Sequence, residues 1–139
     1  MARLTPGEKP KEIENIVITC MDHRYQEFIR QILMDKHGLD IDHVDRLAIG
    51  GSSTGVTDGS LMPSIQIAYE KHGAKNVYML DHLDCGGFGG LEAFDGSEER
   101  EAQAHFESLD RATEAIHKVL PELLVVTYVV GMDGEPVDR

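Results

Sequence analysis

The sequence is poor in several residue types, and each scarcity excludes a class of protein. Its 139 residues include no tryptophan, two cysteines and thirteen basic side chains against 25 acidic ones. Two cysteines are too few for the disulfide framework of a small secreted domain. The formal charge of −12 disfavours nucleic acid and anionic membrane surfaces, because both are negatively charged. We therefore expect no nucleic-acid partner and no membrane partner.

Long apolar runs are also missing. No segment approaches the roughly 20 apolar residues of a membrane-spanning helix, and residues 1–10 lack the apolar core of a signal peptide. We therefore expect a cytoplasmic protein, in which a reducing environment disfavours a disulfide between Cys20 and Cys85. The length suits a single domain with one buried core.

The sequence does contain apolar patterns that alternate between those of strands and those of helices. Continuous apolar runs predict buried strands at 13–19, 44–49, 77–80 and 123–130. Helical spacing predicts helices from Tyr25 to Gly38, from a cap at Thr57 or Asp58 to Gly73, and from Glu98 to Lys118. This alternation predicts an α/β fold: a single domain with a mostly parallel central β-sheet and helices on its faces. We assign residues 1–12 to an N-terminal tail and 13–139 to the domain.

Two compact polar clusters follow the first and third predicted strands. The first cluster, residues 20–24, holds Cys20, Asp22 and Arg24 together with His23, whose side chain is expected to point away from a bound metal ion; the second holds His82 and Cys85. In open parallel sheets ligands bind beyond the carboxyl ends of the strands, where both clusters lie. Two thiolates and an imidazole supply three positions of a tetrahedral Zn²⁺ site and leave the fourth for water, which is the catalytic pattern. The sequence therefore predicts a catalytic zinc site.

Each of these features also has a plainer interpretation. A free cysteine is often simply a small buried apolar residue, and Asp22 with Arg24 would also suit a structural ion pair. His105 lies in the charged helix, where a solvated histidine is favoured over a proton shuttle. The acidic residues 98–101 are expected to form a solvated helix start that suits the positive end of the dipole.

Other polar and glycine residues near the clusters have smaller expected roles. Asp84 is a candidate to fix the turn before Gly86, and Asp81 is a candidate to support His82. The glycine-rich segment 50–55 lacks the Gly-Lys-Ser/Thr ending of a phosphate-binding loop, so we expect a turn there.

The order Cys-x-Asp-x-Arg and then His-x-x-Cys-Gly is the signature of the beta-class carbonic anhydrases, which the chain resembles from about residue 13 to 134 as a short, divergent member. The resemblance implies a beta-carbonic-anhydrase-like fold, with Cys20, His82 and Cys85 as ligands of a Zn²⁺ cofactor and with Asp22 and Arg24 as the catalytic dyad. It also implies reversible hydration of carbon dioxide to bicarbonate by a metal-bound hydroxide. Members usually bury one face of the sheet against a copy of themselves, so a homodimer or larger homo-oligomer is expected.

One departure from the family pattern keeps alternatives open. Many members carry Arg-Asn-Ala-Gly-Gly where this chain has residues 47–51, Leu-Ala-Ile-Gly-Gly, so the wall of the pocket is expected to differ. One alternative is hydrolysis of carbon disulfide or carbonyl sulfide on the same site. Another is a non-catalytic zinc-binding protein in which Asp22 closes the fourth position of the metal.

Overall fold

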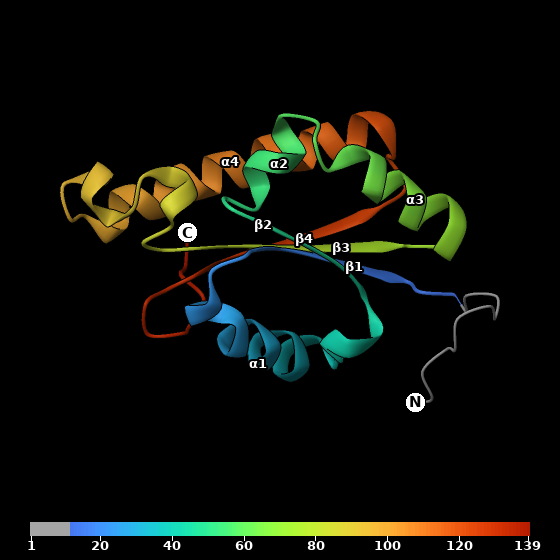
Figure 1. Ribbon diagram of the computed structural model, residues 1–139, viewed down its shortest axis with the longest axis horizontal. Helices are drawn as coiled ribbons and strands as arrows, with labels where there is room; N and C mark the ends of the chain where they lie inside the picture. The colour runs from blue at the N-terminus through green and yellow to red at the C-terminus, as the bar shows by residue number, and fades with distance from the viewer. Residues whose placement is uncertain (1–11) are drawn as a thin grey trace.

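The fold is a parallel β-sheet covered by helices on both faces (Figure 1). The structure is a computed structural model that describes residues 12–139, so nearly all of the tail assigned to residues 1–12 lies outside the described residues. The strands are β1 (Asn15–Cys20), β2 (Asp45–Ile49), β3 (Asn76–His82) and β4 (Leu124–Val130). The α-helices are α1 (Gln26–His37), α2 (Ser53–Thr57), α3 (Met62–His72) and α4 (Glu98–Val119). The predicted α/β fold with a parallel sheet is confirmed.

Helices lie on both faces of the sheet because the inner strands are apolar on both sides. Figure 1 shows α1 on one face and α2, α3 and α4 on the other. The core under α1 is formed by Val17, Tyr25, Ile29, Ile32, Leu33, Ile41, Leu80 and Val130. The larger core on the other face includes Ile16, Ile18, Ile65, Val77, Met79, Leu109, Ala112, Ile116 and Val129. Alternate residues of β1 and β3 thus point into opposite cores, as expected of strands buried on both faces.

The strand order β2-β1-β3-β4 creates a switch point between β1 and β3. The chain leaves β1 through α1 to reach β2 on one side, and later returns through α3 to β3 on the other side of β1. Crevices in α/β sheets open at such points, beyond the carboxyl ends of the strands. Thr19 pairs with Leu80 in parallel register, so Cys20 and His82 lie just beyond this pair on neighbouring strands.

The second helical region differs from its prediction. We predicted a helix capped by Thr57 or Asp58, but residues Ser53–Thr57 form the short helix α2 and the longer helix α3 begins only at Met62. Gly59 has a φ of 86°, a left-handed conformation that interrupts helical geometry between the two. The Asp58 carboxylate instead accepts a hydrogen bond from the backbone N–H of Ser60.

The other helix boundaries agree with the sequence. Gly38 ends α1 with a φ of 65° and Gly73 ends α3 with a φ of 74°, as expected of glycine C-caps. Ser97 caps α4 by accepting a hydrogen bond from the backbone N–H of Arg100. No helix within residues 12–139 has both the length and the apolar character needed to cross a membrane.

Candidate metal centre

The structure brings the three predicted zinc ligands together. The ligand atoms of Cys20, His82 and Cys85 all lie within 4.8 Å of one another, and each of the three residues is buried. The two Sγ atoms are 3.9 Å apart. Zn–S bonds of about 2.3 Å in a tetrahedral site put two sulfurs about 3.8 Å apart, so the spacing of the thiols fits a zinc ion.

His82 has one ring nitrogen fixed and the other unused. Its Nδ1 lies 2.7 Å from the carbonyl oxygen of Leu83, which requires Nδ1 to carry a proton, and in the neutral imidazole this leaves a lone pair on Nε2. Within residues 12–139, this Nε2 is the only buried side-chain nitrogen or oxygen that lacks a hydrogen-bond partner. A buried polar atom without a partner is costly, and a metal ion is a partner that this lone pair suits.

Tyr25 holds the imidazole from one side. Its ring stacks on His82 with the centroids 4.0 Å apart and the planes at 25°. Its hydroxyl donates to the carbonyl oxygen of Leu83, the same acceptor that His82 uses. Burial raises the pKa of Tyr25 to about 12, so the phenol stays neutral and keeps donating. Sequence reasoning did not single out Tyr25.

The pKa values of the two thiols favour binding of a cation. The hydrogen bond that Cys85 donates lowers the pKa of the Cys20 thiol, and backbone hydrogen bonds at Gly51 and Asp22 act in the same direction. The neighbouring Cys20 correspondingly raises the pKa of Cys85. One thiolate therefore forms readily, and a bound cation would favour loss of the second proton, as in thiolate metal sites.

Asp22 and Arg24 form a two-pronged ion pair beside these ligands. Asp22 Oδ1 accepts from the backbone N–H and Nε of Arg24, at 2.9 and 3.1 Å, and Oδ2 accepts from Nε and Nη2, at 3.1 and 2.7 Å. These bonds lower the pKa of Asp22 to about 2, so the side chain is a carboxylate at neutral pH. Its Oδ2 lies 3.9 Å from the free Nε2 of His82, which places the carboxylate at the edge of the candidate metal position.

Arg24 also connects this pair to the loop that carries Cys85. Its Nη1 lies 3.2 Å from Oδ2 of Asp84, and its Nη2 donates to the Asp84 carbonyl oxygen at 3.0 Å. Asp84 Oδ1 accepts from the backbone N–H of Leu91 at 2.9 Å. Asp84 thus fixes the loop after β3, as we predicted for the turn, and it holds Arg24 as well.

The expectation that His105 is solvated was wrong. His105 is 0% exposed, and its Nδ1 and Nε2 lie 2.8 Å from Asp81 Oδ2 and 3.0 Å from Glu101 Oε2. Glu101, at the end of the acidic run expected to be solvated, is also 0% exposed. The side chains of Glu101 and His105 face the sheet because they lie beside the apolar stripe of α4, which packs against the sheet.

Asp81, a candidate to support His82, has other partners. Its carboxylate accepts from the backbone N–H and hydroxyl of Ser53, at 3.2 and 2.8 Å, and faces His105. The Ser53 hydroxyl lies 2.7 Å from that of Ser108 on α4. A sequence signal for this network existed, because Glu101, His105 and Ser108 recur at the i, i+4, i+7 spacing that places residues on one helix face.

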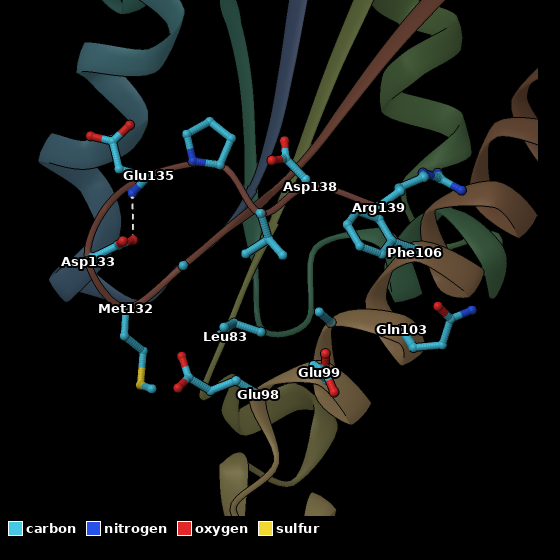
Figure 2. A pocket seen from close by; sticks show the side chains of 14 residues that line it. Leu83, Glu98, Glu99, Gln103, Phe106, Met132, Asp133, Glu135, Asp138 and Arg139 are labelled. Atoms are coloured by element: carbon cyan, nitrogen blue, oxygen red, sulfur yellow. Dashed lines mark hydrogen bonds between the residues drawn. The ribbon is translucent and has the colours of Figure 1, made fainter.

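A separate cleft is lined in part by Leu83, whose carbonyl oxygen His82 contacts. It has a volume of about 840 Å³ and runs between the start of α4 and the C-terminal segment. Figure 2 shows its acidic side chains; Leu83 and Phe106 are among its apolar lining. None of the five predicted site residues lines it. Its carboxylates are Glu98, Glu99, Asp133, Glu135 and Asp138, against one basic side chain, Arg139, a composition that disfavours a small anion.

Comparison with known proteins identifies relatives in sequence and in structure. Over residues 11–137 the chain matches the model of a family described as "Putative carbonic anhydrase". An uncharacterized protein of Rickettsia bellii is 30% identical, over 88% of this chain and 79% of that protein. An uncharacterized protein of Rickettsia conorii is 29% identical, over 88% of this chain and 70% of that protein.

Solved structures with a similar fold are more distant in sequence. A carbonic anhydrase from Glaciozyma antarctica aligns with a TM-score of 0.59 at 20% identity, covering 92% of this chain and 82% of its own. A beta-carbonic anhydrase isoform from Trichomonas vaginalis aligns with a TM-score of 0.64 at 13% identity, covering 97% and 86%. At these identities the likeness concerns the fold.

Proposed function

The chain belongs to the carbonic anhydrase family, as a divergent member with the beta-class fold, and from this premise we propose that it catalyses the reversible hydration of carbon dioxide to bicarbonate. Cys20, His82 and Cys85 are the proposed ligands of a Zn²⁺ ion. The observation that carries the proposal is the free, buried Nε2 of His82 beside two thiols whose sulfurs are 3.9 Å apart. When bound, Zn²⁺ supplies Lewis acidity that makes water a usable nucleophile near neutral pH.

Asp22 is the proposed orienting group for the nucleophile. A carboxylate accepts hydrogen bonds and donates none, so it can bind the hydrogen of the attacking oxygen and direct the lone pair toward the substrate carbon. Arg24 keeps Asp22 ionised and holds its plane by donating to both carboxylate oxygens. The dyad therefore orients the nucleophile, whereas Cys20, His82 and Cys85 hold the ion.

The contacts of Asp22 also favour catalysis over a sealed site. Arg24 holds both of its oxygens, so moving the carboxylate onto the fourth metal position would require weakening several charge-assisted hydrogen bonds. These bonds are among the stronger ones in proteins. The open arrangement is therefore the proposed working form.

A first prediction tests the role of Asp22. Asp22→Asn replaces an acceptor oxygen with an amide that donates, so we expect zinc content per chain to stay at the wild-type level and carbon dioxide hydration to fall roughly 10- to 100-fold. Stopped-flow hydration with zinc-loaded protein at pH 8 to 9, together with metal analysis, provides the measurement.

Two results would contradict the proposal. Zinc-loaded wild-type protein with no hydration rate above buffer would refute the proposed activity. A loss of zinc from Asp22→Asn as large as the loss from Cys85→Ser would show that Asp22 is a ligand. Sulfide release from carbon disulfide or carbonyl sulfide, in place of hydration, would favour the hydrolase alternative.

A further inference from the structure

Cys85 is held differently from the other two proposed ligands. Cys20 ends β1 and pairs with Ile49, and His82 ends β3 and pairs with Val130, so the sheet fixes both. Cys85 lies three residues beyond β3, where no strand neighbour is available. Its position must therefore depend on contacts of the loop itself.

A buried carboxylate supplies two of those contacts, beside the bonds that Arg24 and the backbone N–H of Leu91 make to Asp84 and those that the amides of Phe88 and Gly90 make to the Cys85 carbonyl oxygen. The backbone N–H of Asp84 donates to Glu101 Oε1 at 2.7 Å, and the backbone N–H of Cys85 donates to Glu101 Oε2 at 3.1 Å. Asp84 has a φ of 54°, and this left-handed turn brings the two consecutive amides onto one carboxylate. Both oxygens of Glu101 are thus used to hold the loop.

Glu101 is itself fixed by the interior of the protein. Its Oε2 lies 3.0 Å from His105 Nε2, and the other ring nitrogen of His105 lies 2.8 Å from Asp81. The Phe88 ring lies against His105 with the centroids 3.9 Å apart. Glu101 and His105 are 0% exposed, so water cannot replace these partners.

We propose that Glu101 is a positioning residue for the metal centre: its carboxylate, braced by His105, fixes the Asp84–Cys85 backbone and so places the second thiolate. The proposal rests on the ligand set of the proposed function. A residue that orients a ligand from outside the coordination shell typically changes metal affinity 10- to 100-fold when it is replaced.

The test is zinc affinity, measured by competition with a chromophoric chelator on protein that circular dichroism shows to be folded. Glu101→Gln keeps the shape but turns one acceptor into a donor that opposes a backbone N–H. We expect this variant to bind zinc about 10- to 100-fold more weakly than wild type, and the thiolate-to-metal charge-transfer bands of its Co²⁺ form to shift.

Ser108→Ala is the matched control. Ser108 is buried on the same helix face and ends the same network at Ser53, but its hydroxyl hydrogen bond is to Ser53 and not to the loop after β3. We expect its zinc affinity to stay within about threefold of wild type. An unchanged affinity in Glu101→Gln, or an equal loss in Ser108→Ala, would overturn the proposal.

A measurement on wild-type protein decides the matter if Glu101→Gln does not fold. In zinc-free wild type, the amide hydrogens of Asp84 and Cys85 should exchange as slowly as those of β3, because Glu101 holds them. Exchange at the rate of exposed loop amides would overturn the proposal. These measurements involve no substrate. A protein that binds zinc but does not hydrate carbon dioxide would therefore refute the proposed function and leave the role of Glu101 standing.

Discussion

At the scale of single residues, Arg24 links two segments that are 60 positions apart. It donates to the carboxylate of Asp22 on one side and to the carboxylate and carbonyl of Asp84 on the other. The guanidinium fork allows this, because its donors point in several fixed directions in one plane. The orientation of Asp22 therefore depends on the loop that carries Cys85.

A second prediction concerns this link. Asp84→Asn suits the left-handed φ of 54° but removes the charge that faces Arg24, so we expect normal folding and zinc content with hydration reduced about tenfold. Steady-state hydration kinetics and metal analysis provide the measurement.

Asp95→Asn is the control for this substitution. Asp95 also has a φ of 54° and pairs with an arginine, Arg100, at 3.1 Å, but it does not contact the predicted dyad. Its activity should equal that of wild type. Equal activity of the two variants would show that the contact between Asp84 and Arg24 does not serve the site.

At the scale of elements, the loop after β2 crosses the end of β1 and meets η3 (Gly86–Phe88), the single turn after Cys85. A Cβ on Gly87 would lie 2.6 Å from Cα of Gly51. Because β1 lies between β2 and β3 in the sheet, this contact closes the structure over the strand that carries Cys20. Only glycine allows two backbones to approach this closely.

A third prediction tests this contact. Gly87→Ala would force the two loops apart, so we expect a loss of about 1–3 kcal/mol in the free energy of unfolding, measured by chemical denaturation. Gly86→Ala is the control, since a Cβ there meets no heavy atom within 4 Å. Equal stability losses in the two variants would contradict the close approach of the loops.

At the scale of the whole molecule, the proposed ion would join segments from both halves of the chain. Cys20 comes from β1 on one side of the switch point, and His82 and Cys85 come from β3 and the loop after it. A ligand that binds only the folded state stabilises it, because unfolding separates the binding groups. The homo-oligomer and the cytoplasmic location expected from the sequence stay predictions.

A fourth prediction follows for metal removal. With free zinc at 100 times its dissociation constant, binding stabilises the fold by about 2.7 kcal/mol, so a chelator should lower the Tm of wild type by roughly 8 °C. Differential scanning calorimetry measures this shift. Cys85→Ser should show nearly the same Tm with and without the chelator. A wild-type Tm that does not change when the chelator is added would contradict the metal site.

The sequence alone determined most of the elements and the set of candidate ligands. Apolar runs and helical spacing are local properties, so the strands and α1 and α4 were predicted to within about two residues. Cys20, His82 and Cys85 were singled out by their ligand chemistry at strand ends, and Asp22 and Arg24 by the resemblance to the beta-class carbonic anhydrases. The structure brings all five together.

Only the tertiary structure decided how the surroundings of the site are built. Whether Glu101 and His105 face solvent or the sheet depends on how far α4 is rotated about its axis, which is set by packing against distant segments. The bond between Arg24 and Asp84 likewise depends on β1 and β3 being neighbours. Such contacts join residues far apart in the chain, so the spacing of Glu101, His105 and Ser108 indicates a shared helix face but not the partners of that face.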